Sequence, residues 1–156
     1  MLAIAERALP RYAPQLRDDL WLQEELDYLW VNHFADVPRV NQVNVSFMGA
    51  WKTRLGLITL SEDERTTYIG LNSLLRLPDV PYYVASITLA HEMVHYCHGF
   101  GSPLPRQFKY PHRGGIVEKE LKRRGLGAEY EIYEDWVYTH WYDFYARITG
   151  RCRRSH

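Results

Sequence analysis

The stretch YYVASITLAHEMVHYCH, residues 82–98, decides the fold. Its apolar residues recur every three or four positions, which predicts an α-helix with one buried side. Asp79 can cap the start of this helix, and Pro81 suits its first turn. Gly99 and Gly101, which follow the stretch, can end it. The segment is too apolar for a solvent-exposed helix, so we expect it to pack inside the protein.

The pentapeptide HEMVH inside this helix predicts a metal site. His91 and His95 are four residues apart, so on a helix they point the same way, one turn apart. Both imidazoles can then reach one tetrahedral Zn²⁺ ion. Glu92 projects from an adjacent side, where its carboxylate can take a proton from a metal-bound water whose pKa has fallen to about 7. Five residues therefore offer two ligands and a general base.

A catalytic zinc ion usually has three protein ligands and an open fourth position. His112 is the preferred third ligand, because a loop long enough to turn back separates it from His95. His98 lies one turn beyond His95, but three ligands in a row along one helix converge poorly on one ion, which favours a hydrogen-bonded core role for His98. Glu118 and Glu120 are the carboxylate alternatives. No functional role is expected for His33, His140 and His156.

Three further helices are predicted from apolar spacing and end signals. The first covers 15–34 and ends before Pro38, the second covers 116–125, and the third is an aromatic helix at 128–148. We interpret the aromatic side chains of the last helix as a cover for the apolar face of the domain. The alternative is a stacking surface for single-stranded nucleic acid, helped by Arg151, Arg153 and Arg154.

Three alternating, β-branched segments predict a small sheet. They are VNVSFM (43–48), LGLITL (55–60) and TTYIGL (66–71). We interpret them as an antiparallel meander, with a mixed sheet as the alternative. Strand 66–71 is expected at an edge, and Asn72 at its end is expected to bind backbone. The order of elements predicts an α+β fold in which helices pack on a three-stranded sheet.

Composition fits one soluble domain spanning residues 1–156, with a helical region at 1–40 and a catalytic core at 43–126. The chain has 46% hydrophobic residues and a formal net charge of zero, which argues against disorder and against a dedicated nucleic-acid binder. Cys97 and Cys152 are too few for a disulfide scaffold or a four-cysteine zinc site. With no apolar run long enough for a membrane span and no signal peptide, a cytoplasmic protein is expected.

Four segments carry a family resemblance. They are WKTRLG (51–56), YIGLNSLL (68–75), residues 84–95 with HEMVH, and HRGGI (112–116). In this order they resemble the SprT-like zinc metallopeptidases and related minimal zincin domains. Arg113 stands where that family often has glycine, and Ile116 where it often has phenylalanine. The zinc ribbon of larger members has no counterpart, because the chain has no cysteine pairs.

The resemblance implies a zincin-like minimal metalloprotease fold and hydrolysis of peptide bonds in a protein or peptide substrate. It implies one Zn²⁺ ion held by His91, His95 and His112, with Glu92 as the catalytic base. Tyr110 is a candidate for stabilising the oxyanion, but a loop aromatic without this role is the favoured interpretation. Zincin domains often hold their substrate by backbone pairing at a strand edge, and the resemblance implies 66–71 as that edge. Two other functions stay open. One is a metal-dependent hydrolase of a small phosphate-containing molecule, and the other is a binding module with a structural metal.

Basic side chains cluster after the metal helix. They are Arg106, Lys109, Arg113, Lys119, Lys122, Arg123 and Arg124. Such a cluster can attract an acidic substrate or one bound to nucleic acid. A solvated helix face is the favoured interpretation, because the chain as a whole is neutral.

Overall fold

The protein has an α+β fold, as the order of elements predicts. The structure is a computed structural model, and it describes residues 16–150. The helices and strands are α2 (Asp19–His33), β1 (Gln42–Phe47), β2 (Gly56–Leu60), β3 (Thr66–Leu71), α3 (Tyr82–Cys97), α4 (Ile116–Arg123) and α5 (Gly127–Thr149), with short 3₁₀ turns at Ser73–Arg76 and Arg113–Gly115. The four predicted helices and three predicted strands are confirmed, with bounds that differ by at most a few residues.

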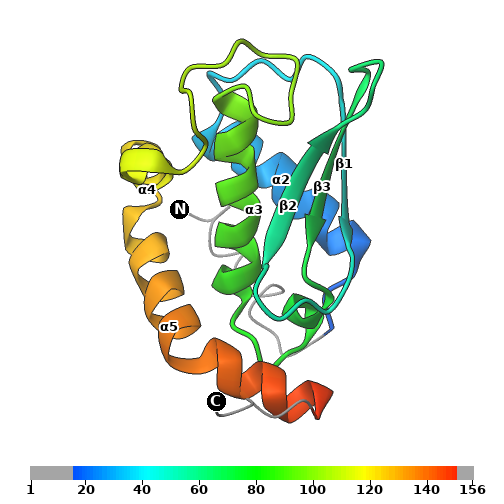
Figure 1. The fold of residues 1–156 in the computed structure, drawn as a ribbon, viewed down its shortest axis with the longest axis vertical. Coiled ribbons are helices and arrows are strands. Elements are labelled where there is room, and N and C mark those ends of the chain that lie inside the picture. Colours follow the sequence, from blue (N-terminus) through cyan, green and yellow to red (C-terminus); the bar gives the residue numbers. More distant parts are fainter. Residues whose placement is uncertain (1–15, 151–156) are drawn as a thin grey trace, which may run out of the picture.

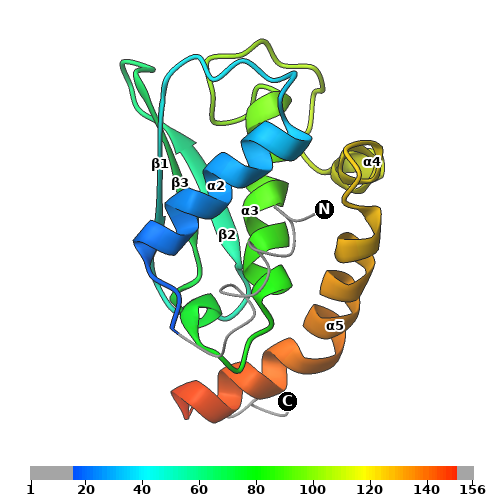
Figure 2. The same cartoon turned by 180° about the vertical axis from the view of Figure 1, so that it is seen from behind.

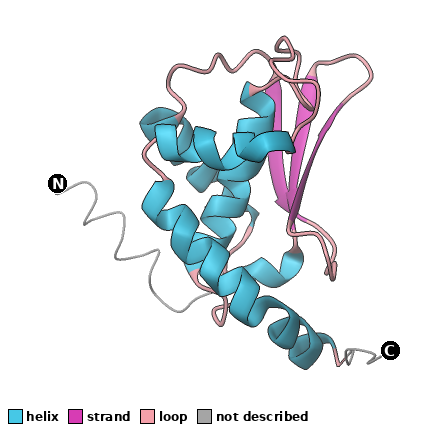
Figure 3. Cartoon of the chain, turned by 60° about the vertical axis from the view of Figure 1, so that its left-hand side comes forward, coloured by secondary structure: helices cyan, strands magenta, loops and turns pink. Residues whose placement is uncertain are grey.

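The helices gather on one face of the sheet (Figures 1 and 3). Helix α3 lies between the sheet and the α4–α5 pair in Figure 1, and it packs against β2 and β3. Helix α2 packs on β1 and crosses α3, as Figure 2 shows from behind. The metal helix is therefore the central element of the domain.

The sheet is mixed, with strand order β1-β3-β2. Strands β2 and β3 form an antiparallel hairpin, but β1 runs parallel to β3. The expected antiparallel meander is therefore wrong for β1, and 66–71 is the central strand, not an edge. The lengths of the two connections explain this order. The connection at 48–55 is long enough to cross the end of β3, whereas the short turn at 61–65 allows only a hairpin between β2 and β3.

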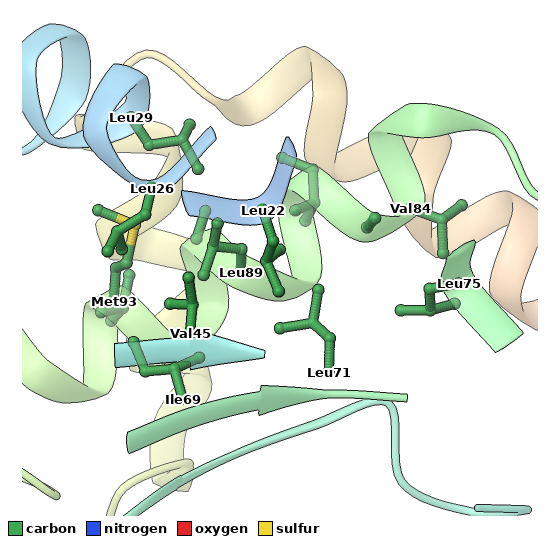
Figure 4. Close-up of a cluster of buried hydrophobic side chains, with 14 of the residues drawn as sticks. Leu22, Leu26, Leu29, Val45, Ile69, Leu71, Leu75, Val84, Leu89 and Met93 are labelled. Carbon is green, nitrogen blue, oxygen red and sulfur yellow. The ribbon is translucent and has the colours of Figure 1, made fainter. Parts of the chain in front are cut away.

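The core joins one face of the sheet to helices α2 and α3. Figure 4 shows leucines of α2 meeting the inward side chains of β1 and β3 and one side of α3. The buried residues labelled there are Leu22, Leu26, Leu29, Val45, Ile69, Leu71, Leu75, Val84, Leu89 and Met93. Deleting a buried leucine from such a cluster usually costs about 2–5 kcal/mol, so this core fixes the position of α3 against the sheet.

The sequence correctly predicts the C-terminal end of α3 but not the cap at its N-terminal end. Gly99 has a φ of 84° and ends the helix as predicted, with the Phe100 N–H donating to the His95 carbonyl at 2.8 Å. This is a Schellman motif, which needs a left-handed residue at that place. The predicted cap at Asp79 is wrong. Pro81 occupies the N-cap position without a side-chain bond, and Asp79 lies 3.7 Å from the Arg147 guanidinium.

Some expectations fall outside the described residues. They concern residues 1–15 of the N-terminal region, Arg151, Cys152, Arg153, Arg154 and His156. Between residues 16 and 150, no helix combines the length and the apolar character needed to cross a bilayer.

Candidate metal centre

Three histidine side chains converge on one point. His91 and His95 come from α3, and His112 comes from the loop that leads into α4. The Nε2 atoms are 3.1 Å apart for His91 and His95, 2.9 Å for His95 and His112, and 3.3 Å for His91 and His112. A tetrahedral Zn²⁺ ion with bonds of 2.0–2.1 Å holds its ligand nitrogens about 3.3 Å apart. The sequence-predicted set is thus brought together with the spacing of a metal site.

The protonation state of these rings also fits a cation. Burial, helped by the neighbouring rings, lowers the pKa of His91 to about 4 and that of His95 to about 3. Both rings are therefore neutral at neutral pH, which is the form that binds metal. The three converging Nε2 atoms cannot all be satisfied by hydrogen bonds to one another. A divalent cation would serve all three as a common partner, so this group is able to hold a metal ion.

Local structure brings His112 back to the helix. After Gly99 the loop is tied to the end of α3, because the Gln107 side chain donates to the Cys97 carbonyl at 3.0 Å. The Phe100 ring stands edge-on to the His95 ring, with centroids 6.3 Å apart. Gly114 and Gly115 then turn the chain into α4 with φ values of 76° and 66°. These positive φ values explain why glycines occupy positions 114 and 115.

Glu92 is the buried carboxyl of the site, with 6% of its surface exposed. Burial raises its pKa to about 8, and the positive charge of Arg54 acts in the opposite direction. Strand β2 comes very close to it at Gly56. A Cβ there would stand 2.9 Å from Thr88 and 3.1 Å from the Glu92 Oε1 atom, so only glycine lets the strand and the helix meet.

The histidines and Glu92 lie in an open cleft of about 820 Å³. One wall is β2 with the residues before it, and α3 forms the floor. The opposite wall is α5, which contributes Tyr133, Val137, Trp141 and Tyr142. Because β2 lines the cleft, it takes the place that the sequence interpretation gave to 66–71. The metal-binding group is therefore accessible to a substrate.

The alternative ligands lie elsewhere. His98 is fully buried, and its Nε2 atom is 3.0 Å from the Glu120 carboxylate. Glu118 pairs with Lys122 at 3.1 Å. Cys97, His98 and Glu120 form a second group of metal-ligand type. There the Arg124 guanidinium already contacts both Cys97 at 3.4 Å and Glu120 at 2.9 Å, and its charge opposes a metal cation.

Tyr110, the candidate oxyanion helper, is not brought to the site, in agreement with the favoured interpretation as a loop aromatic. Its ring is 45% exposed and lies beneath Lys109 and Arg113, and it does not line the cleft. Tyr133 of α5 does line it. Burial raises the pKa of its phenol to about 12, so the hydroxyl stays protonated as a donor. Sequence analysis places Tyr133 in the aromatic helix, with a cover for the apolar face as the favoured interpretation and nucleic-acid stacking as the alternative, and neither assigns it to this site.

The basic residues of α4 are largely engaged in ion pairs. Arg123 and Arg124 both contact Glu120, Arg124 also pairs with Asp36, and Lys122 pairs with Glu118. In the aromatic helix, Trp141, Phe144 and Tyr145 are buried, while Trp136 is half-buried. Both observations agree with the structural interpretation of these two segments.

Comparison of the chain with protein-family models, with curated proteins and with solved structures finds no match. The class that fold and site define is an α+β protein with three converging histidines, able to hold a metal ion, beside a buried carboxyl.

The raised pKa of Glu92 predicts how the stability of the metal-free protein depends on pH. Between its ordinary value of 4.5 and about 8, the folded protein holds this proton more tightly than the unfolded chain does, so stability falls as pH rises. Below about 6.5 the lowered pKa values of His91 and His95 act the other way. Because the unfolded histidines are still half protonated at pH 6.5, they offset part of the Glu92 effect, and from pH 6.5 to 8 we expect a net loss of about 1 kcal/mol in the free energy of unfolding.

Urea denaturation in excess chelator measures this loss, and Glu92→Gln is the matched variant because its amide does not titrate. The variant is expected to show a flatter profile over the same pH range. Equal slopes for both proteins would show that Glu92 does not hold a proton in the folded state.

Proposed function

We propose that this protein is a zinc-dependent metallopeptidase that hydrolyses peptide bonds, with Glu92 as general base. The observation that carries the proposal is the convergence of three imidazoles beside a buried carboxyl in an open cleft. Among the described residues no fourth metal-ligating side chain joins the group, which favours a catalytic over a structural metal. The motif resemblance to SprT-like metallopeptidases supports the same conclusion.

A bound Zn²⁺ ion would polarise the scissile carbonyl and lower the pKa of a coordinated water to about 7. Glu92 would accept one proton of the attacking water as its oxygen bonds to the carbonyl carbon. It would then pass that proton to the amine nitrogen as the C–N bond breaks. A carboxyl whose pKa has moved toward neutrality is suited to both steps.

The substrate would lie along β2. This strand pairs with β3 on one side only, so its other edge is available to the backbone of an extended peptide. Residues 55–59 line the cleft, and Gly56 brings that edge next to Glu92. A peptide paired there would pass in front of the histidines, with its side chains facing the aromatic wall of α5.

The direct test is cleavage of an unfolded protein by the zinc-loaded chain, followed by gel electrophoresis and mass spectrometry. We expect cleavage that a chelator stops and added zinc restores. A parallel panel of phosphate esters tests the rival hydrolase function. Cleavage of phosphate esters alone, or peptide cleavage that ignores the chelator, would contradict the proposal.

Tyr133 is expected to stabilise the oxyanion that forms during hydrolysis. Its protonated hydroxyl lies in the same cleft as Glu92, and the charge of the Glu92 carboxylate raises the pKa of Tyr133. Losing one such donor usually lowers kcat by about 10²–10³-fold, so Tyr133→Phe should reduce kcat with little change in KM. Steady-state kinetics give both numbers. Tyr138→Phe, at a tyrosine that is 91% exposed, is the control and should retain full activity.

A further inference from the structure

The loop at 48–55, between β1 and β2, is held in place from two sides. Buried Asn72 donates its side-chain amide to the carbonyls of Trp51 at 2.7 Å and Arg54 at 2.9 Å. Its backbone N–H donates to the Leu55 carbonyl at 2.7 Å. From the other wall, the Trp141 indole donates to the Lys52 carbonyl at 2.8 Å. The expectation that Asn72 binds backbone is confirmed, and the backbone of Arg54 is fixed at the cleft.

The side chain of Arg54 is exposed and lines the cleft with Glu92 and the histidines. The two groups line the same cleft, yet among the described residues they form no ion pair within 4 Å. Within residues 16–150, Arg54 pairs with no carboxylate. Its guanidinium lies over the Trp51 ring, with the guanidinium carbon 6.0 Å from the ring centroid. Other arginines, such as Arg39 and Arg124, do have acidic partners.

The cleft contains one charged side chain of each sign. Among its lining residues Glu92 is the only carboxyl and Arg54 the only arginine. A negative group on a substrate would therefore meet its complementary charge at Arg54. Guanidinium groups bind carboxylates through two parallel hydrogen bonds, which gives geometric selectivity as well as affinity. In a peptide, that group is either an acidic side chain or the C-terminal carboxylate.

We infer that Arg54 is a specificity residue that binds a carboxylate of the peptide substrate close to the scissile bond. The inference rests on the proposed peptidase function and names the substrate class of the same site. Both sources of the carboxylate would reach Arg54 from a peptide laid along β2, because the residues at 54 and 55 lead directly into that strand.

The test uses zinc-loaded full-length protein and pairs of fluorogenic peptides. One series places Glu or Gln at each of the three positions on either side of the scissile bond. The other compares a free C-terminal carboxylate with its amide. We expect at least one acidic peptide to exceed its neutral partner about 10–100-fold in kcat/KM. Preference in the first series assigns an acidic side chain, and preference in the second assigns the chain end.

Arg54→Met is expected to bring this ratio near one, and Arg54→Lys to leave an intermediate ratio, because lysine keeps the charge without the planar fork. Arg65→Met is the matched control. Arg65 lies exposed in the turn between β2 and β3, outside the cleft, so its loss should preserve both ratio and activity. A ratio near one in the wild type, or the same ratio in Arg54→Met, would overturn the inference and leave the peptidase proposal intact.

A binding measurement separates the two proposals. Zinc-loaded Glu92→Gln, with and without Arg54→Met, is titrated with each peptide pair by tryptophan fluorescence. Tighter binding of the acidic peptide that disappears with Arg54→Met supports the role of Arg54, even if the wild type cleaves no peptide and the peptidase proposal fails. Equal affinities for both members of every peptide pair would overturn the role of Arg54.

Discussion

Replacing Glu92 with glutamine is expected to lower kcat/KM for peptide cleavage by about 10²–10⁴-fold, the usual contribution of a general base. The amide has nearly the same shape and can fill the same buried position, but it cannot accept the proton of the attacking water. Glu92 does not belong to the converging histidine group, so the variant should bind zinc as the wild type does. Initial rates with a fluorogenic peptide and metal analysis of the same sample measure both quantities.

The control for this variant is Glu62→Gln, at an exposed glutamate in the turn between β2 and β3. It makes the same chemical change outside the cleft and should leave the rate unchanged. If zinc-loaded Glu92→Gln cleaved peptides as fast as the wild type, Glu92 would not be the base. A loss of bound zinc in that variant would instead place Glu92 among the ligands.

The second large effect is expected at His112. Replacing a hydrogen-bond partner of a metal ligand already weakens metal binding by 10–100-fold, so His112→Ala, which removes a ligand, should weaken zinc binding by more than about 100-fold. His112 is exposed on its loop, so the fold should tolerate the change. Competition with a chromophoric chelator gives the dissociation constant.

Thermal or chemical unfolding gives an independent readout of the same change. Zinc at 100 times its dissociation constant should raise the free energy of unfolding of the wild type by about 2.7 kcal/mol. At that zinc concentration His112→Ala should gain less than about 1 kcal/mol. His140→Ala, at an exposed histidine of α5, is the control. An unchanged affinity in His112→Ala would remove it from the site.

Most of the fold could be predicted from the sequence, because the local helix and turn signals agree with the packing in the structure. Helix α3 combines an apolar pattern with a glycine stop, and the hairpin of β2 and β3 follows from a short polar turn. The parallel pairing of β1 could not be read from its residues, because alternation fixes which face a side chain occupies but not which neighbour a strand chooses. The predicted cap at Asp79 is wrong, because α3 begins after Pro81 and has no side-chain cap at that end.

In the site, too, local spacing predicts some residues and only the fold places the others. His91, Glu92 and His95 follow from helical spacing alone, and His112 was the preferred third ligand among four. The roles of Tyr133 and Arg54 could not be predicted, because they belong to α5 and to the loop before β2, which the fold alone brings to α3. Tyr110 was a candidate because it is close to His112 in sequence, but its exposed ring contacts Lys109 and Arg113 and lies outside the cleft.

The most direct test of the central claim is zinc K-edge X-ray absorption on the purified, zinc-loaded protein. One zinc ion per chain is expected, with three imidazole nitrogens and one further light atom at about 2.0–2.1 Å. A sulfur neighbour at about 2.3 Å would move the metal to Cys97. Either that result or the absence of stoichiometric zinc would contradict a centre built from His91, His95 and His112.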